Sequence, residues 1–481
     1  MSASKVGEGD NQIVQGATPK QTGYPAAGLG DPAAGLGDPL GVIPPGSPGM
    51  ALQDLKGIVG EERARRGCSE DAVDGVEPDL VVEPQSIEEA SEVLMLAHRA
   101  GMAVIPRGAG TKLHWGNPPS RVDLTVGTSG LNQVLEHAAG DLVVRVQAGT
   151  PIEQLQTELA EAGQRLALDP PEPGATVGGI IAANASGPLR HRFGTARDQL
   201  IGITCMLPNG KVAKSGGKVV KNVAGYDLGK LFTGSLGTLG LLVEAIFRLH
   251  PVPAARRTVV IRGIGDPATL GDAVQRFLHS SLVPAALEFS WEAEGMLVAM
   301  FEGIAPGVEA QAKTAVDLLG PYGDVQVFDE QEQRRWWEEW AGRHSGRPLP
   351  ETPLPEGGEG ETVVLKVGVV PTELPHVLRR VVSLRDRSPG VVPRLTGHAG
   401  CGITFVELTG DEQRLVEAIG EIRHFARGRG GSAVVRRAPH QIKQAVEVWG
   451  PVGDALPLMR RVKEQFDPDG IMSPGRFVGG I

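Results

Sequence analysis

The sequence predicts an α+β protein with two folded domains behind a disordered leader, and three observations support this fold class. The first 49 of the 481 residues are rich in Gly, Pro, Ala and Asp. Strand and helix patterns then alternate over residues 50–253. From residue 254 to residue 460 the order changes, and a strand, a helix and two further strands follow one another. A turn-rich tail, residues 461–481, ends the chain.

The leader, residues 1–49, contains the tandem repeat "AAGLGDPAAGLGDP" at Ala26–Pro39. It carries almost no aromatic or β-branched side chains, so burial cannot offset the entropy that ordering would cost. Gly and Pro in each copy exclude a coiled coil despite the seven-residue period. We therefore expect disorder, with a functional tether as the alternative.

Composition restricts the classes of partner. The formal net charge is -10, which argues against nucleic acid or an anionic membrane as a binding partner. Three widely spaced cysteines, Cys68, Cys205 and Cys401, form neither a disulfide framework nor a CxxC motif, so we expect a reducing, cytoplasmic location. The first residues show no basic start followed by an apolar run, so we expect no secretory signal. No apolar stretch reaches the ~18 residues of a spanning helix. Membrane association would have to come through partners.

The first domain begins with a capped helix. Ser86 is followed by Glu89 three residues on, as in a capping box, and one apolar face recurs from Ile87 to Ala97. The short apolar run "MAVIP" predicts a buried strand that ends in a glycine-rich loop. The run "DLVVRVQAG" predicts a second strand, and "PIEQLQTELAEAG" predicts a helix with Pro in its first turn and Gly after its end.

The sequence of the second domain predicts two ferredoxin-like halves. The first half contains the strand 257–263, the helix 272–280 and the strands "AALEFSW" and "MLVAMFEG". The strand "TVVLKVGVVP" and the helix "ELPHVLRRVVSL" begin the same order again, after a Pro-, Gly- and Glu-rich loop at 346–361. Together they predict an antiparallel sheet with helices on one face.

The loop "PRGAGTKLHWG" is a candidate anion site. Gly108 and Gly110 permit a backbone nest of N–H groups, while Arg107 and Lys112 add positive charge. It is not a Rossmann fingerprint, because the third glycine would fall at Leu113. It is not a metal site either, since no further His or Cys lies at ligand spacing around the histidine of this loop. A plain strand-to-helix turn is the simpler interpretation of this loop alone.

Two more segments, 169–202 and 216–251, are dense in small residues. Glycine and alanine let a backbone approach a flat ligand closely, although either segment alone could simply be tightly packed. "GGK" in the second segment is not a Walker sequence, because Val219 follows where Ser or Thr is required. Three such segments in one domain predict a large, extended cofactor.

These segments carry a resemblance. "PRGAGTKL", "TVGGIIAANASGPLRHRFG", "GGKVVKNVAGYDLGKLFTGSLGTLG" and "FDPDGIMSPGR" resemble the FAD-linked oxidases of the vanillyl-alcohol-oxidase, or PCMH-type, flavoprotein superfamily. More narrowly, "GGKVVKNVAGYDL", "VWGPVGDALPLMRRVKEQFDP" and "PGRFVGGI" resemble the FAD-binding E subunit of bacterial glycolate oxidase.

The resemblance implies a fold and a function. Residues 50–253 would be a PCMH-type FAD-binding domain, residues 254–460 the ferredoxin-like cap, and residues 461–481 a tail that packs back on the FAD domain. The function would be oxidation of a 2-hydroxy acid, glycolate or D-lactate, to the 2-oxo acid by hydride transfer to FAD. The partners would be a related flavoprotein D subunit and an iron–sulfur subunit. The alternative is a non-catalytic or electron-relay subunit that binds FAD while a partner flavoprotein performs the chemistry.

The resemblance also implies which residues contact FAD. The first loop would bind the pyrophosphate, the second segment would continue toward the flavin, and the third would border the adenosine or isoalloxazine edges. The implied cofactor-binding residues are Pro106, Arg107, Gly108, Ala109, Gly110, Thr111, Lys112, Thr176, Val177, Gly178, Gly179, Asn184, Ser186, Gly187, Phe193, Gly194, Asp227, Glu244 and Ile246.

Two departures from the family pattern are informative. Relatives that attach FAD covalently have a histidine where this chain has Thr111, so we expect non-covalent FAD. The segment "HAGCGITF" stands where catalytic relatives have "HxGDGNxH", with Cys401 and Phe405 replacing the acid and the second histidine. Too few ligands remain for a metal site. His398 is left as the candidate base, with a histidine hydrogen-bonded under a glycine loop as the alternative.

Two smaller features have simpler interpretations. Arg436 and Arg437, just before His440, could bind a substrate carboxylate, but a solvated basic turn is the simpler interpretation. "RRWWEEW", at 334–340, places three tryptophans on a predicted helix, where a core or interface role is the more common one.

Overall fold

The computed structural model describes residues 48–217, 225–344 and 360–481. The predictions for the leader up to residue 47, and for most of the loop at 346–361, lie outside these residues.

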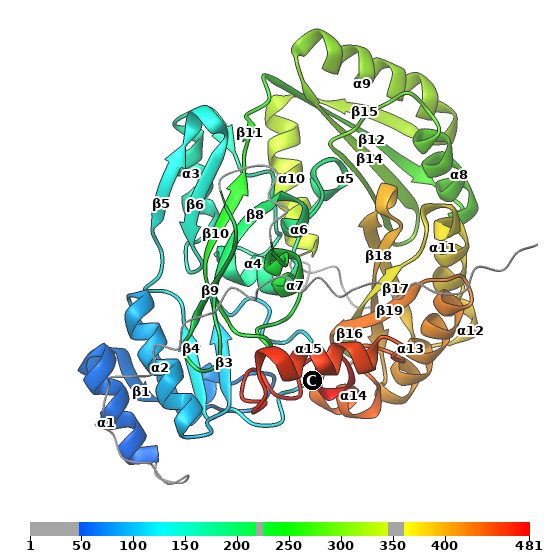
Figure 1. The fold of residues 1–481 in the computed structure, drawn as a ribbon. Helices are drawn as coiled ribbons and strands as arrows, with labels where there is room; N and C mark the ends of the chain where they lie inside the picture. The colour runs from blue at the N-terminus through cyan, green and yellow to red at the C-terminus, as the bar shows by residue number, and fades with distance from the viewer. Residues whose placement is uncertain (1–47, 218–224, 345–359) are drawn as a thin grey trace, which may run out of the picture. The chain divides into compact units, whose positions relative to one another are not determined.

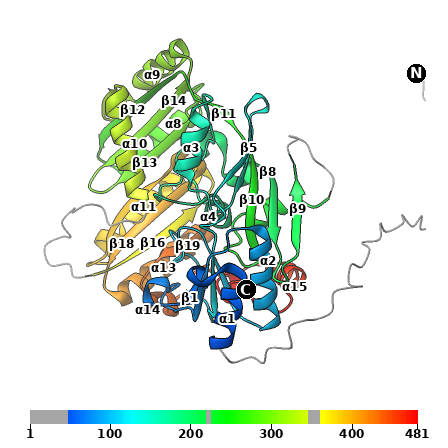
Figure 2. The same cartoon turned by 90° about the vertical axis from the view of Figure 1, so that its left-hand side faces the viewer.

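The first domain contains two larger sheets, of four and five strands, and a short two-stranded sheet formed by β7 and β11 (Figures 1 and 2). The four-stranded sheet has the order β1-β2-β4-β3, in which β2, β4 and β3 are parallel and β1 is antiparallel. Ser86 caps the helix between β2 and β3, because its Oγ accepts from the Glu89 N–H at 3.0 Å. The Glu89 carboxylate binds Arg63 at 2.6 Å and accepts from the Gln85 N–H at 2.8 Å, not from that of Ser86, so the reciprocal half of the expected capping box is absent at this helix. The elements are α1 (Pro48–Val59), β1 (Ala64–Arg66), β2 (Leu80–Val82), α2 (Ile87–Arg99), β3 (Val104–Arg107) and β4 (Leu124–Gly127).

The larger sheet of this domain is antiparallel and has the order β5-β6-β10-β8-β9. Helices α3 and α4 pack on it around a core that includes Val146, Leu155, Ile180 and Phe247. The elements are β5 (Val134–Ala138), β6 (Val143–Gln147), α3 (Ile152–Ala160), β7 (Gln164–Arg165), α4 (Val177–Ala183), α5 (Arg190–Phe193), α6 (Ala196–Gln199), β8 (Leu200–Met206), β9 (Val212–Gly216), α7 (Leu228–Phe232), β10 (Leu241–Arg248) and β11 (His250–Pro251).

The cap is one eight-stranded antiparallel sheet with the order β15-β12-β14-β13-β17-β18-β16-β19. Each half follows the expected strand–helix–strand–strand–helix–strand order, and the halves join where β13 pairs with β17. Helices α8, α9, α11 and α13 cover one face (Figure 1), and the tryptophans of α10 pack on the other face of the first half. The first half is β12 (Ala255–Ile264), α8 (Pro267–Leu278), β13 (Ala286–Trp291), β14 (Gly295–Gly303), α9 (Ala305–Leu319), β15 (Asp324–Phe328) and α10 (Glu330–His344).

The second half of the cap leads into the C-terminal tail. After α15 the chain runs beside β3 of the first domain, where Ser473 donates to the Val104 carbonyl and Val104 donates to the Ile471 carbonyl, both at 2.8 Å. The tail is thus joined by backbone hydrogen bonds to the strand that precedes the glycine loop. The elements are β16 (Glu361–Gly368), α11 (Leu374–Val382), α12 (Leu384–Arg387), β17 (Val392–His398), β18 (Ile403–Gly410), α13 (Glu412–Arg427), β19 (Ser432–Arg437), α14 (His440–Ala445) and α15 (Leu456–Phe466).

Candidate cofactor and substrate site

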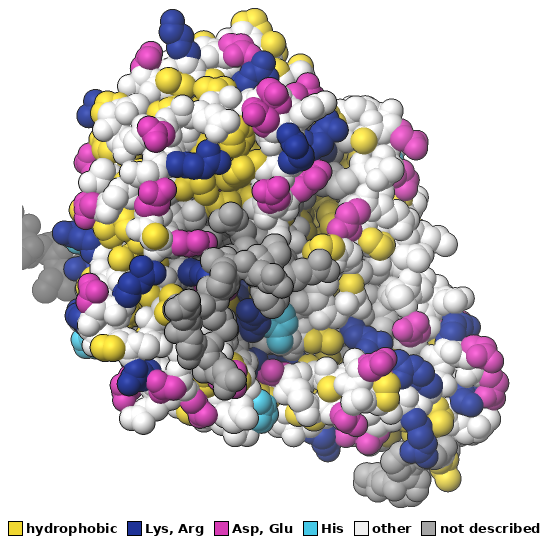
Figure 3. All heavy atoms as spheres, turned by 180° about the vertical axis from the view of Figure 1, so that it is seen from behind, with side chains coloured by type: hydrophobic (Ala, Val, Ile, Leu, Met, Phe, Trp, Pro, Cys, Tyr) yellow, Lys and Arg dark blue, Asp and Glu magenta, His cyan; other side chains and the backbone are white. Residues whose placement is uncertain are grey.

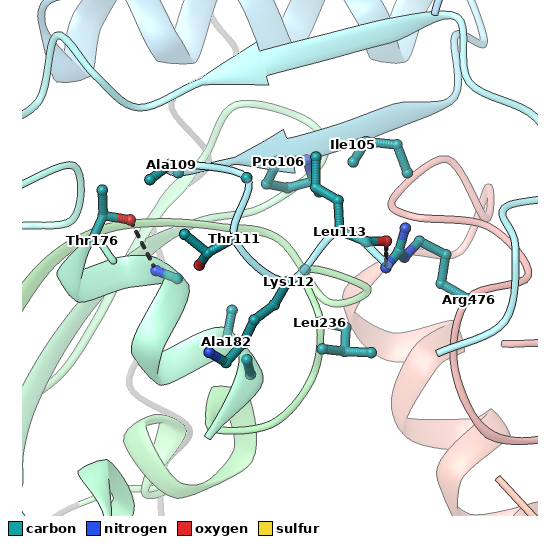
Figure 4. A pocket seen from close by; sticks show the side chains of 15 residues that line it. Ile105, Pro106, Ala109, Thr111, Lys112, Leu113, Thr176, Ala182, Leu236 and Arg476 are labelled. Atoms are coloured by element: carbon teal, nitrogen blue, oxygen red, sulfur yellow. Dashed lines mark hydrogen bonds between the residues drawn. The ribbon is translucent and has the colours of Figure 1, made fainter. Parts of the chain in front are cut away.

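The glycine loop after β3 lies against the start of α4 (Figure 4). Thr176 caps α4, and its Oγ1 accepts from the Gly179 N–H at 3.4 Å. A Cβ placed on Gly108 would be only 2.1 Å from the Thr176 Oγ1, so a side chain at 108 would force the loop and the helix apart. Gly110 has φ +76°, a conformation that favours glycine. At Gly108 and Gly110 the loop therefore presents backbone atoms without side chains.

Three cavities meet at this surface. The first, of about 580 Å³ and open to solvent, lies between the loop, α4, Leu236–Gly237 and the C-terminal tail. The second, of about 380 Å³ and also open to solvent, shares Gly108 and Gly179 with the first. The third, of about 430 Å³ and likewise open to solvent, shares Lys112 with the first and extends to the cap. An extended ligand could lie across all three, as a dinucleotide cofactor requires.

Most of the predicted cofactor-binding residues gather around these cavities. The loop residues Pro106, Gly108, Ala109, Gly110, Thr111 and Lys112 line the first cavity together with Thr176 and Gly179. Arg107 and Gly178 line the second, and Asn184, Ser186 and Gly187 line the third. Val177 is buried in the domain core beside them.

Besides Val177, five predicted residues line none of these three cavities. Each of the five has a local structural role. The Glu244 carboxylate binds Arg145 at 2.9 Å inside the sheet, and Asp227 caps α7 by accepting from the Lys230 N–H. The ring of Phe193 packs on His250 with centroids 4.8 Å apart. The remaining two are Gly194, which ends α5 with φ +76°, and Ile246, which packs over Gly202. We leave these five out of the proposed FAD contacts.

The Arg107 guanidinium is already engaged by a carboxylate. Its Nη1 lies 2.8 Å from the Asp71 Oδ1, and Arg65 binds the same carboxylate at 2.6 Å. The two arginines hold the pKa of Asp71 well below its usual range. Because its side chain is held by Asp71, Arg107 can offer the second cavity little beyond its backbone and aliphatic part.

Two more loop residues, Lys112 and His114, are largely buried, and burial lowers the pKa of each. The Lys112 ammonium forms an ion pair with Glu172 and lies 4.7 Å from the centroid of the Trp115 ring. Burial, followed by the charge of Lys443, lowers the pKa of His114 to about 4, so this histidine is neutral at physiological pH. Within the described residues, no three His, Cys, Asp or Glu side chains are grouped as metal ligands.

The third cavity is strongly basic. Besides Lys112, its lining includes Arg190, Lys366 and Arg436, whereas Glu172 is its one acidic residue. Burial, helped by the two arginines, lowers the pKa of Lys366 to about 7. Burial also lowers the pKa of Arg436 to about 9, so the guanidinium stays charged at neutral pH.

These cations are positioned without carboxylate partners. Arg190 donates to the Ser186 Oγ at 3.0 Å, and the Arg436 Cζ lies 3.1 Å above the centroid of the Trp115 ring. Within the described part of the chain, none of the ion pairs within 4.0 Å involves Arg190, Lys366 or Arg436. The cavity is therefore suited to an anionic ligand.

His398 lines this cavity beside the cations. Its Nδ1 lies 2.7 Å from the Glu288 Oε1, and Trp340 donates from Nε1 to the other Glu288 oxygen at 3.2 Å. Burial, with Arg190 and Lys366 nearby, holds the pKa of His398 well below its usual range. The imidazole is therefore neutral at physiological pH.

Sequence reasoning missed several of these residues. A charged residue inside an apolar strand was the available signal for Glu288 in "AALEFSW" and for Lys366 in "VVLKVGVV". Arg190 offered no such signal. The interpretation of Arg436 as part of a solvated basic turn is wrong, because its guanidinium lines the cavity and stacks on Trp115.

The glycine cradle, the neighbouring cavities and the cap fit a flavoprotein oxidoreductase, and the family models identify this class. A model of the FAD binding domain matches residues 78–216, and a model of the C-terminal domain of FAD linked oxidases matches residues 253–477. The chain belongs to the FAD-linked oxidases, and FAD is its cofactor.

Two curated relatives agree with this family. The glycolate oxidase subunit GlcD of Bacillus subtilis is 27% identical over 429 residues, which cover 83% of this chain and 89% of the relative. A D-lactate dehydrogenase of Archaeoglobus fulgidus is 29% identical over 429 residues, covering 83% and 91%. The resemblance to the E subunit stays a prediction.

The fold also matches p-cresol methylhydroxylase with substrate bound. Its TM-score is 0.67 and its identity 17%, over 89% of this chain and 96% of that one. For alkyldihydroxyacetonephosphate synthase the TM-score is 0.68 at 18% identity, over 91% and 87%. At these identities the likeness concerns the fold alone.

Proposed function

We propose that this chain is the FAD-binding subunit of a glycolate oxidase-type complex, which oxidises glycolate or D-lactate to the 2-oxo acid. The observation that carries the proposal is the third cavity, where Arg190, Lys366 and Arg436 surround a ligand space next to the neutral imidazole of His398. A 2-hydroxy acid needs both features, a cationic site for its carboxylate and a base for its hydroxyl.

The residues of the third cavity would have two different roles, carboxylate binding and proton transfer. Arg190, Lys366 and Arg436 would bind and orient the carboxylate. His398 would take the hydroxyl proton on Nε2, because its Nδ1 is engaged by Glu288, and the Glu288 charge would stabilise the imidazolium that forms. When bound, FAD supplies the acceptor for the hydride that leaves Cα. The proton on His398 and the hydride together account for the two-electron oxidation to the 2-oxo acid.

The first two cavities would hold FAD without a covalent bond. Backbone N–H groups of the loop from Gly108 to Lys112 would bind the diphosphate, with the Thr111 hydroxyl as a further donor. Thr111 stands where covalently linked relatives have histidine, and it supplies no nucleophilic nitrogen for such a link.

Electrons would leave through partners, a related flavoprotein D subunit and an iron–sulfur subunit. The three cysteines of this chain are too far apart in sequence for a cluster motif. Acidic and basic side chains are interspersed over the face shown in Figure 3, so the described part of this face carries no broad basic patch of the kind that nucleic acid needs. Among the described helices, none is long and apolar enough to cross a bilayer. We propose a cytoplasmic location, with any membrane association arising through the partners.

Anaerobic titration of the purified flavoprotein tests the function. Adding glycolate or D-lactate should bleach the visible flavin band and yield one equivalent of 2-oxo acid. Oxidised flavin that stays unchanged with both acids, and that is reduced only when a partner flavoprotein and its substrate are added, would favour the electron-relay alternative. Replacement of the acid and second histidine of the family motif by Cys401 and Phe405 is the observation behind that alternative.

A further inference from the structure

Arg476 connects the C-terminal tail to the glycine loop. Its side chain crosses from the tail to the loop (Figure 4), where Nη2 donates to the carbonyls of Leu113 at 2.8 Å and Trp115 at 2.5 Å. Its own carbonyl accepts from the Trp449 Nε1 at 3.1 Å. Backbone and side chain are therefore both fixed, and the residue is only 3% exposed.

The charge of this guanidinium is not balanced by a neighbour. Its Nη1 is buried and has no hydrogen-bond partner in the described structure. Asp74, the acid that acts on it electrostatically, is itself bound to Lys443 at 2.6 Å. Burial lowers the pKa of Arg476 to about 10, so it remains protonated at neutral pH. A buried cation of this kind is costly unless an anion accompanies it.

Arg476 lines the same cavity as Gly108, Thr111 and Thr176. The other two cations of the loop are already engaged by carboxylates, Arg107 by Asp71 and Glu83, and Lys112 by Glu172. We propose that Arg476 is a cofactor-binding residue: it supplies the cationic donor for the diphosphate of FAD and makes retention of the cofactor depend on the docked C-terminal tail. The proposal needs FAD as cofactor but does not depend on which substrate is oxidised.

Binding of FAD and ADP to the full chain, stripped of FAD, tests the proposal. ADP carries the diphosphate without the flavin. In Arg476→Gln, whose amide can still donate to the loop carbonyls, we expect the Kd for FAD and the Kd for ADP each to rise about tenfold or more. Arg476→Lys keeps a charge but cannot reach both the loop carbonyls and the diphosphate. Its affinities for FAD and ADP should therefore fall between those of wild type and Arg476→Gln.

Lys443→Gln is the matched control. Lys443 also donates to loop carbonyls, those of His114 at 2.6 Å and Gly116 at 3.3 Å, but it does not line the cavity. Losing it should lower the Tm of the apoprotein while changing both Kd values less than about threefold. If Lys443→Gln weakens FAD binding as much as Arg476→Gln, Arg476 is only a clamp on the loop and the proposal fails.

A second outcome would also overturn the proposal. If Arg476→Gln weakens FAD but binds ADP like wild type, the guanidinium serves the flavin part and not the diphosphate. Should Arg476→Gln not fold, Arg476→Lys decides between the same outcomes, because an ADP affinity equal to that of wild type contradicts a diphosphate contact.

Discussion

Glu288 and His398 are direct cross-strand partners at the seam between the two halves of the cap. Glu288 on β13 pairs with His398 on β17 in the antiparallel register, and the Oε1 and Nδ1 atoms are 2.7 Å apart. Both side chains are almost completely buried, with exposures of 0% and 1%. The joining of two ferredoxin-like halves thus creates a carboxylate–imidazole pair that neither half contains alone.

We expect Glu288→Gln to lower kcat about tenfold to a thousandfold with little change in KM. The amide removes the charge that stabilises the imidazolium but leaves the carboxylate-binding cations in place. Steady-state kinetics with glycolate or D-lactate would measure this split. Glu302→Gln is the control, because Glu302 is equally buried but pairs with Arg165 and Arg256 outside the three cavities. Glu302→Gln should lower the Tm and leave kcat close to that of wild type. A larger loss of kcat in Glu302→Gln than in Glu288→Gln would contradict the role of Glu288.

The pKa of Lys366, about 7, predicts a pH dependence of kcat/KM. Burial lowers this pKa, so in the free enzyme Lys366 is protonated below pH 7 and loses its charge as the pH rises. A substrate carboxylate needs the charged form, and kcat/KM should therefore fall as the pH passes through about 7. Lys366→Arg should make the profile flat, because arginine stays charged, while Lys366→Met should be slow at every pH. An unchanged profile in Lys366→Arg would assign the ionisation to another group.

The glycine loop could be predicted from the sequence because its requirements are local. The φ of +76° at Gly110 favours glycine whatever the rest of the fold does. The close approach of Gly108 to Thr176 depends on how the loop packs on α4, so only the structure shows it. The pairing of Glu288 with His398 depends instead on a register set across 110 residues, which no local pattern contains. Glu244 was assigned to the cofactor by resemblance, yet its carboxylate is held inside the sheet by Arg145.

Trp115 should position Arg436 for the substrate. The Arg436 Cζ lies 3.1 Å from the centroid of the Trp115 ring, on the side of the third cavity. Trp115→Leu removes this cation–π contact, and we expect KM to rise about threefold to thirtyfold with kcat less affected. Trp115→Phe keeps an aromatic face and should stay within about threefold of wild type. FAD affinity measured in parallel should be nearly constant in both variants, since a large loss would mean that the ring supports the cofactor loop.

Gly108→Ala should abolish or severely weaken FAD binding. The new Cβ would lie 2.1 Å from the Thr176 Oγ1, and that oxygen caps α4, so relief of the clash must displace the loop or uncap the helix. Gly57→Ala is the control, because a Cβ at this helical position meets nothing within 4 Å and alanine favours a helix by up to about 1 kcal/mol. The ratio of visible flavin absorbance to protein absorbance in the purified variants would measure the effect. Normal flavin content in Gly108→Ala would show that the loop can move away from Thr176 without losing the cofactor, which contradicts a rigid cradle.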